Sequence, residues 1–332
     1  MSQRILEQIN RLSAFARKNS KMKRFALIGA AGYIAERHMK AIKETGNQLI
    51  CAADRFDVMG RIDSFFPQAE FFLDAKALDK FMDIHKREGN PIEYVSICSP
   101  NYLHSSHISF ALNKGAHAIC EKPLVIYPKE LAVIKNIEKE TGNRIYTILQ
   151  LRYHPTILAL KKKIDEGGNK IYDIDLTYIT TRGKWYQKSW KGDPKKSGGI
   201  ATNIGIHFFD MITWIFGKVK QNVVHLYEPA KAAGYLELEK ARVRWFLSLD
   251  YQDLPKVATD KGMRTFRSIS VNGDEVEFSG GFTDLHTVTY ENILNGNGFG
   301  IDDTKESIIL ADNVRNARPI GIKGDYNPFF KR

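Results

Sequence analysis

Cysteine is scarce in this chain, with three residues in 332, and this scarcity excludes several classes of protein. Cys51, Cys98 and Cys120 each lie in an apolar, strand-like segment and lack the paired spacing of zinc ligands. They predict neither a disulfide framework nor a zinc site. We interpret them as small core residues of a protein kept in a reducing compartment, and we expect a cytoplasmic location.

Long apolar runs are missing as well. No run approaches the roughly 20 residues of a membrane-spanning helix. Residues 1–22 instead place Ile5, Ile9 and Leu12 at helical spacing among basic residues, which predicts an amphipathic helix without the apolar core of a secretory signal. Two interpretations stay open, a mitochondrial-type presequence and a short helix that packs on the first domain or on another subunit. Initiation at Met22 is a further alternative.

Acidic residues are outnumbered, 38 against 49 basic ones, which gives a net charge of +11. The basic residues are spread along the chain, whereas a nucleic-acid-binding surface usually gathers them in a stripe. Attraction of anionic small molecules is the simpler interpretation. A length of 332 residues, 43% of them hydrophobic, predicts two domains with proper cores.

A glycine-rich turn follows the first predicted strand, at residues 23–28, and a predicted helix follows the turn. Gly29, Gly32 and Ala35 are each three apart, one residue longer than the usual dinucleotide fingerprint. Gly29 permits the tight turn, Gly32 lets backbone amides approach a pyrophosphate, and Ala35 allows close packing of helix on strand. The predicted cofactor contacts of this turn are Gly29, Gly32, Tyr33 and Ile34.

An acidic residue ends the second predicted strand. Asp54 follows the apolar segment 48–53 and lies 25 residues after Gly29, close to the position of a ribose-binding acid. A carboxylate there accepts from ribose hydroxyls and repels a 2′-phosphate, which favours NAD over NADP. Arg55 leaves this preference open, because an adjacent arginine can hold such a phosphate. The structural alternative for Asp54 is a helix cap or turn residue.

Two further motifs end strands of the same domain. Ser99-Pro100-Asn101 stops the segment 93–98, and Glu121-Lys122-Pro123 stops the segment 118–120. Because the carboxyl ends of parallel strands share the edge where ligands bind, we expect both motifs near the glycine turn. Burial there would lower the pKa of the lysine and let it exchange protons. The alternative is a solvated loop lysine paired with its neighbouring glutamate.

Strands and helices alternate up to residue 150, with helices predicted to about 45, at 104–114 and at 129–141, and a last strand at 144–149. This order predicts a doubly wound parallel sheet, a Rossmann domain over 23–150. Residues 151–332 have a different pattern. Strand-like alternation occurs at 172–182, 222–226, 240–250, 267–271 and 275–278, and Asn272-Gly273 predicts a hairpin turn. We predict an α+β domain there, with a large, open, mostly antiparallel sheet that offers an assembly surface.

One predicted helix, at 200–216, interrupts these strands. Asn203 and His207 are four apart and therefore share a helix face, and Asp210 is three further on. A histidine with a polar neighbour one turn back suits proton transfer with a substrate hydroxyl. The alternative is a packed or solvent-tipped histidine. No accompanying ligand pattern indicates a metal.

The segment 182–193, just before this helix, interleaves aromatic and basic side chains. Such a pattern can stack a base and bind phosphate or carboxylate groups. Lys184, Tyr186 and Lys191 are therefore candidate substrate contacts. A surface loop with two buried tryptophans is the alternative, and both can hold at once.

The motifs together resemble the Gfo/Idh/MocA oxidoreductase family over residues 22–330. The matching features are the glycine turn 29–35, Ser99-Pro100-Asn101 with His104, Glu121-Lys122-Pro123, and Gly198-Gly199 through Asn203, His207 and Asp210. The resemblance implies an NAD(P)-binding Rossmann domain joined to an α+β domain with a large open sheet. It also implies a homo-oligomer, a dimer or a homotetramer, with NAD as cofactor.

A subgroup of the family is more similar still. The shared segments are 150–152, 181–183, 185–186, 188–194, 201–205 and 281–286, together with the glycine turn. This resemblance implies oxidation of the 3-hydroxyl of UDP-N-acetyl-D-glucosaminuronic acid, on the way to diacetamido uronic acids of bacterial O-antigen and other surface polysaccharides. 2-Oxoglutarate is a further expected partner, since some members of the subgroup use it to recycle NADH.

The resemblance also implies roles for single residues. Lys122 and His207 are the expected catalytic pair, and Asn203 stands where the wider family has an aspartate, so that it can orient a sugar hydroxyl but cannot act as a base. The expected cofactor contacts beyond the glycine turn are Asp54, Ser99, Asn101, His104, Glu121 and Lys122. The expected substrate contacts are Asn203, Arg152, Lys184, Lys191 and Tyr186.

Two other classes of function remain as alternatives. A related dehydrogenase of another sugar or polyol, such as inositol, would share these motifs and would be separated by a substrate panel. A non-catalytic NAD-binding or nucleic-acid-binding protein would use the basic charge, and salt-sensitive binding without turnover would identify it.

Overall fold

The first of two sheets is the parallel sheet that the sequence predicts. A computed structural model describes residues 22–276 and 284–331, so the predicted helix at 1–22 and the first residues of segment 281–286 lie almost wholly outside it. All neighbouring strands of this sheet run parallel, in the order β3-β2-β1-β4-β5-β6 of a doubly wound dinucleotide-binding fold. Its strands are β1 (Arg24–Ile28), β2 (Gln48–Ala53), β3 (Glu70–Phe72), β4 (Tyr94–Ile97), β5 (His117–Cys120) and β6 (Ile145–Thr147).

Helices cover both faces of this sheet, as its apolar strands require. Local signals set their ends: the Asp74 side chain accepts from Lys76 N at the start of α4, and Gly142 ends α6 with a left-handed φ of 69°. The glycine turn, the loop after β4 and the loop after β5 thus meet at one edge. The helices are α2 (Ala35–Glu44), α3 (Met59–Asp63), α4 (Ala75–Arg87), α5 (His104–Asn113) and α6 (Pro128–Thr141).

The second sheet is mixed and mostly antiparallel, which confirms the predicted fold class. Among its described strands, which follow the order β12-β11-β7-β10-β9-β8, only β7 and β10 pair in parallel. Asn272 and Gly273, both at positive φ (53° and 90°), form the predicted hairpin turn. The strands are β7 (Tyr172–Thr180), β8 (Val219–Tyr227), β9 (Lys231–Leu238), β10 (Ala241–Ser248), β11 (Thr265–Val271) and β12 (Asp274–Glu275).

Strand β9 is absent from the sequence prediction because small residues with low strand propensity occupy its first half. Packing explains them. A Cβ on Gly234 would stand 2.4 Å from Val223 O and 2.5 Å from the ring of Trp245, so the glycine makes room for a fully buried tryptophan. Tertiary packing therefore decides this strand.

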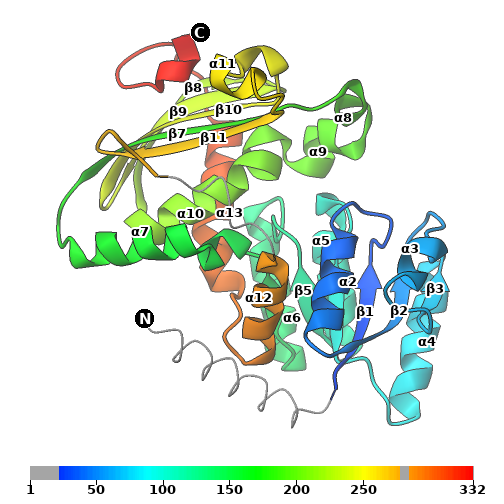
Figure 1. The fold of residues 1–332 in the computed structure, drawn as a ribbon. Helices are drawn as coiled ribbons and strands as arrows, with labels where there is room; N and C mark the ends of the chain where they lie inside the picture. Colours follow the sequence, from blue (N-terminus) through cyan, green and yellow to red (C-terminus); the bar gives the residue numbers. More distant parts are fainter. Residues whose placement is uncertain (1–21, 277–283, 332) are drawn as a thin grey trace, which may run out of the picture.

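Helices connect the two sheets (Figure 1). α7 (Pro155–Glu166) and α10 (Ile206–Phe216) lie against one face of the second sheet, and α13 (Ile301–Asn316) packs on α10 and extends to α6 of the first domain. α12 (Leu285–Leu294) packs on α2. Within the described residues no helix is both long and apolar enough to cross a membrane. The other α-helices of the described residues are short: α8 (Lys184–Lys188), α9 (Pro194–Ser197) and α11 (Lys256–Thr259).

The predicted continuous helix at 200–216 is not regular. Ala201–Gly205 form a π-helical turn, and the α-helix α10 begins only at Ile206. A π turn changes the angular spacing of its side chains and often occurs at functional sites. Asn203 lies inside this turn and His207 in the first turn of α10.

Candidate active site

The predicted catalytic residues meet in one small pocket between the two sheets. Lys122 comes from the loop after β5, Asn203 from the π turn and His207 from α10. Two other predicted substrate contacts, Tyr186 and Lys191, join them from the segment before the π turn. The full lining is Lys122, Tyr178, Arg182, Tyr186, Lys191, Asn203, Ile204 and His207.

The environment of Lys122 favours proton exchange. Burial lowers the pKa of its ammonium, the charge of Glu121 opposes this, and the nearby cations Lys191 and Arg182 lower the pKa further. A lysine with a lowered pKa can donate a proton or a hydrogen bond to an oxygen that gains negative charge.

His207 is held in its neutral form. Burial lowers the pKa of its imidazole well below the usual 6.5, and the charge of Lys122 lowers it further. A neutral imidazole can accept a proton at neutral pH. The pocket therefore pairs a proton acceptor with a cation.

Asn203 has a fixed orientation between two other side chains. Its Nδ2 donates to Tyr186 Oη at 2.7 Å, and its Oδ1 accepts from Asn101 Nδ2 at 3.3 Å. Asn101 Nδ2 also donates to Ser197 O at 2.9 Å. Burial raises the pKa of Tyr186, so its hydroxyl stays protonated and can donate to a ligand while its oxygen accepts from Asn203. Asn101, predicted as a cofactor contact, here joins the first domain to the pocket.

The glycine turn has no room for a side chain at its first position. Gly29 has a φ of +91°, and a Cβ on it would stand 2.5 Å from Ser99 N and 2.6 Å from Cys98 C. Gly32 is less crowded but still tight, with Gly29 O at 3.1 Å from such an atom. Such a close-packed turn at the edge of a parallel sheet fits the approach of a dinucleotide pyrophosphate.

Asp54 stabilises this turn through hydrogen bonds to the backbone. Its Oδ2 accepts from Ala31 N at 2.9 Å and its Oδ1 from Phe56 N at 3.1 Å, so the turn-residue interpretation holds. Each carboxylate oxygen keeps a second lone pair, which leaves the acid able to accept from ribose hydroxyls as well. Of the other predicted contacts in the turn, the Tyr33 side chain is 81% exposed and Ile34 packs partly against the core.

Gly29→Ala should destabilise the protein and weaken NAD binding. The new methyl group would collide with backbone that cannot move independently, and a left-handed conformation alone costs roughly 1–2 kcal/mol for an L-residue. Gly46→Ala is the matched control, because Gly46 has a φ of +75° with open space around it. We expect Gly46→Ala to cost only the conformational part, measured by urea denaturation and NAD titration. Equal effects of the two substitutions would contradict the steric argument.

His104 ties two of the motif loops together. Its Nε2 lies 2.9 Å from Ser99 O and its Nδ1 lies 2.7 Å from Pro123 O, and a neutral ring donates to one of them at a time. The Ser99 hydroxyl pairs with His107 Nδ1 at 2.8 Å. The buried His104 therefore connects the Ser-Pro-Asn loop to the Glu-Lys-Pro loop.

Two predicted substrate contacts are not brought to the pocket. The Lys184 side chain is exposed on α8 and does not line it. Arg152 is 4% exposed and bonded to Asp210, with Nε to Oδ2 at 3.0 Å and Nη2 to Oδ1 at 2.8 Å. Its Nη2 also donates to Asp303 O at 2.6 Å.

Several residues of the site were not predicted from the sequence. Arg182 and Tyr178 line the pocket, and His38 and His286 both contact Glu121, the neighbour of Lys122 in the chain. The alternation of β7 predicts that Tyr178 is buried but not what it faces. Within the described residues, His38, Glu121 and His286 form the one group with the spacing of metal ligands, and hydrogen bonds account for their contacts.

Comparisons with known proteins agree with this geometry. Residues 23–149 match the family model described as the NAD-binding Rossmann fold of the GFO/IDH/MocA oxidoreductases, and residues 161–309 match the model of their C-terminal alpha/beta domain. A solved structure of the WlbA (WbpB) dehydrogenase from Thermus thermophilus with NAD and alpha-ketoglutarate is 50% identical, with a TM-score of 0.90 over 93% of this chain and 100% of that one. A second structure of that enzyme, with NAD and UDP-GlcNAcA, has a TM-score of 0.89 at the same identity and coverage.

Curated relatives are more distant. Glucose-6-phosphate 3-dehydrogenase of Bacillus subtilis is 28% identical over 59% of this chain, and inositol 2-dehydrogenase of Rhizobium meliloti is 26% identical over 59%. The matches span about half of these enzymes, 54% and 55% of their lengths.

Proposed function

We infer that this chain, which belongs to the Gfo/Idh/MocA oxidoreductase family and is an NAD-dependent sugar dehydrogenase, oxidises the 3-hydroxyl of UDP-N-acetyl-D-glucosaminuronic acid to the 3-keto sugar. The Thermus thermophilus dehydrogenase, which is 50% identical to this chain and has been solved in complex with UDP-GlcNAcA, supports this substrate.

The charge of the pocket is the observation that carries the proposal. Lys122, Arg182 and Lys191 line it, and its described lining includes no carboxylate. A neutral sugar or polyol offers such a group of cations little charge to stabilise. A uronic acid joined to a diphosphate offers a carboxylate and two phosphates, which pair well with guanidinium and ammonium groups.

Four of the pocket residues have proposed roles in the reaction. His207 takes the proton of the 3-hydroxyl, while Lys122 donates a hydrogen bond to the same oxygen and stabilises its developing negative charge. Asn203 and Tyr186 orient the sugar. The glycine turn, Asp54 and the neighbouring motif loops would hold NAD⁺, which would supply the acceptor for the hydride of C3.

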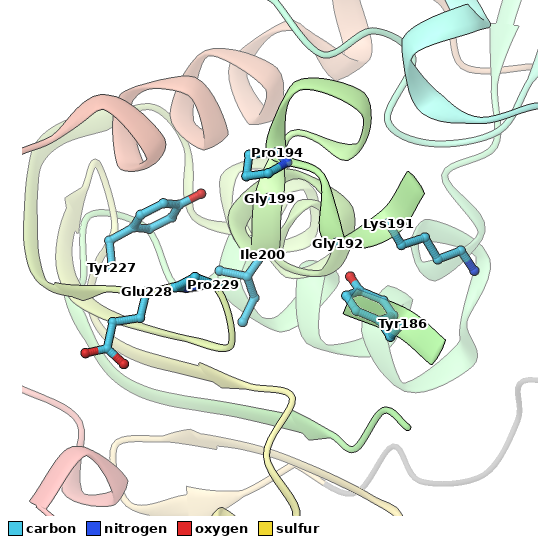
Figure 2. Close-up of a pocket in the computed structure, with 9 residues that line it drawn as sticks. All are labelled: Tyr186, Lys191, Gly192, Pro194, Gly199, Ile200, Tyr227, Glu228 and Pro229. Carbon is cyan, nitrogen blue, oxygen red and sulfur yellow. The ribbon is translucent and has the colours of Figure 1, made fainter. Parts of the chain in front are cut away.

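A second pocket adjoins the first, and we propose that it accommodates the nucleotide part of the substrate. Tyr186 and Lys191 line both pockets. Figure 2 shows Ile200 between Tyr186 and the turn that carries Tyr227, Glu228 and Pro229. We propose that the sugar occupies the first pocket and that the nucleotide extends toward the second, with Lys191 between them.

The first experiment follows NADH absorbance when the purified protein is mixed with NAD⁺ and UDP-N-acetylglucosaminuronic acid, with and without 2-oxoglutarate. Steady NADH production supports the substrate and a cycle that releases NADH. Appearance of 3-keto sugar and 2-hydroxyglutarate, only when 2-oxoglutarate is present, supports internal recycling. Absence of product in both conditions, with turnover of inositol or glucose 6-phosphate instead, would overturn the substrate and favour the alternative.

We propose that the product enters synthesis of diacetamido uronic acids for surface polysaccharides. We also propose that the chain divides into a cofactor domain (23–150) and a substrate and assembly domain (151–332). Its proposed location is the cytoplasm. We also propose that it assembles as a dimer or homotetramer through the open sheet.

A further inference from the structure

Glu121 is buried next to the pocket residue Lys122 in the chain, and both of its carboxylate oxygens have partners. Oε1 lies 3.0 Å from His38 Nε2 and 3.0 Å from His286 Nε2. Oε2 accepts from the backbone N–H of Lys122 at 3.2 Å. The glutamate therefore connects two buried histidines to the main chain of the proposed catalytic lysine.

The hydrogen bonds of this network have one consistent direction. An ionised carboxylate only accepts, so both imidazoles must carry a proton on Nε2. A neutral His38 then accepts at Nδ1, and the Tyr290 hydroxyl, 2.7 Å away, must donate to it. The Tyr290 oxygen in turn accepts from Ser96 Oγ at 2.6 Å. In this order, each donated hydrogen of the chain from Ser96 to Glu121 has an acceptor.

Several elements contribute to the network. His38 belongs to α2, the helix after the glycine turn, and His286 belongs to α12, which packs on α2. The centroids of the two imidazole rings are 5.2 Å apart, and the rings meet edge to face. Burial would raise the pKa of the Glu121 carboxyl, but hydrogen bonds from His286 and His38 hold it well below its usual range.

The other titratable groups around Glu121 do not replace these donors. Lys122 contributes its backbone amide and its charge. The thiols are buried with raised pKa values and stay neutral, as do His104 and His207, whose pKa values are lowered. Among the described residues, the titratable groups that hydrogen-bond to Glu121 or interact with its charge include His38, His286, Lys122, His104, His207, Tyr290, Cys98 and Cys120.

We propose that His38 and His286 are positioning residues of the dehydrogenase: together they hold Glu121 as a fixed buried anion that sets the backbone of Lys122 and stabilises its ammonium group. The proposal rests on the role of Lys122 in the proposed function. It gives a role to two histidines that are not part of the pocket lining.

The test compares Glu121→Gln, His286→Leu and His286→Gln with the wild type. The first readout needs no substrate: acylation of the Lys122 amine is followed by peptide mass spectrometry from about pH 6 to about pH 10. Glutamine at position 121 can keep an amide oxygen where Oε1 accepts from the two histidines, but it loses the acceptor of the Lys122 backbone N–H and removes the charge that favours the ammonium. The Lys122 amine should therefore be acylated at a lower pH, and the pH of half-maximal labelling should fall by about one unit or more.

The second readout is the pH profile of kcat/KM. Leucine at position 286 removes one hydrogen-bond donor, so Glu121 should take up a proton at a higher pH than in the wild type. The acid limb of the kcat/KM profile should therefore shift to higher pH. At one unit below the new midpoint, activity should be about tenfold lower than at the plateau. Glutamine at position 286 places an amide N–H near the lost Nε2–H and should restore most of the wild-type profile.

Three results would overturn the proposal. They are an unchanged Lys122 labelling profile in Glu121→Gln, equal damage from glutamine and leucine at position 286, and stoichiometric zinc that a chelator removes together with activity. If the wild type does not oxidise UDP-N-acetylglucosaminuronic acid, the substrate is wrong and the labelling arm still decides the role of Glu121. Thermal unfolding of each variant separates loss of folding from loss of positioning.

Discussion

Replacing Lys122 with methionine, or His207 with asparagine, should lower kcat by roughly 10²–10⁴-fold while NAD still binds. The two side chains line one pocket and differ in charge state, since burial keeps His207 neutral and the adjacent lysine lowers its pKa further. Oxidation of a hydroxyl needs a proton acceptor and stabilisation of the developing oxyanion. Each substitution removes one of these while leaving the glycine turn untouched.

The control for this prediction is Lys184→Met, a change of the same type at an exposed lysine outside the pocket lining. It should leave kcat within about twofold of the wild type. Steady-state kinetics with UDP-N-acetylglucosaminuronic acid and a fluorescence titration with NADH measure the two effects separately. Near-normal turnover in both pocket variants, or loss of NAD binding in both, would contradict the assigned roles.

The pH dependence gives a further check on His207. Its pKa lies well below 6.5 in the folded protein, so the neutral, proton-accepting form persists as the pH falls to that value and is lost only below it. The acid limb of kcat/KM should therefore lie below pH 6.5. An acid limb above that value would assign it to another group.

The sequence predicts the first domain well because its signals are local. Apolar strands, a glycine turn and Pro-stopped loops repeat along the chain, and parallel topology then brings Gly29, Asn101 and Lys122 to one edge. The mixed second sheet is also predicted in class, although β9 is missed because small residues occupy its first half and no local signal shows that the Trp245 ring requires Gly234.

The parts of the site that the sequence does not predict depend on long-range contacts. His38 and His286 are 248 positions apart in the sequence and meet only because α12 packs on α2. The π turn at 201–205 has no local signature that separates it from the helix that follows. Arg152 is predicted to contact the substrate because it lies in a shared motif. The fold shows instead that its guanidinium is paired with Asp210.

Arg152→Met should destabilise the folded protein by about 3–5 kcal/mol, the usual cost of removing one partner of a buried ion pair. Asp210 would lose two hydrogen bonds, and Asp303 O would lose a third. The guanidinium also lies 4.8 Å from the ring centroid of Phe299 and 5.4 Å from that of Trp214, so its loss removes packing between three elements.

Two comparisons separate this structural role from a substrate contact. Lys162→Met breaks an exposed pair with Glu166 and should cost under about 1 kcal/mol. The double change Arg152→Met with Asp210→Leu removes both buried charges and should recover much of the stability, because an apolar replacement leaves no unpaired ion. Urea denaturation measures these free energies. At a temperature where Arg152→Met is folded, its KM for the UDP-sugar should stay within about twofold of the wild type, and a much larger rise would mean that Arg152 contacts the substrate after all.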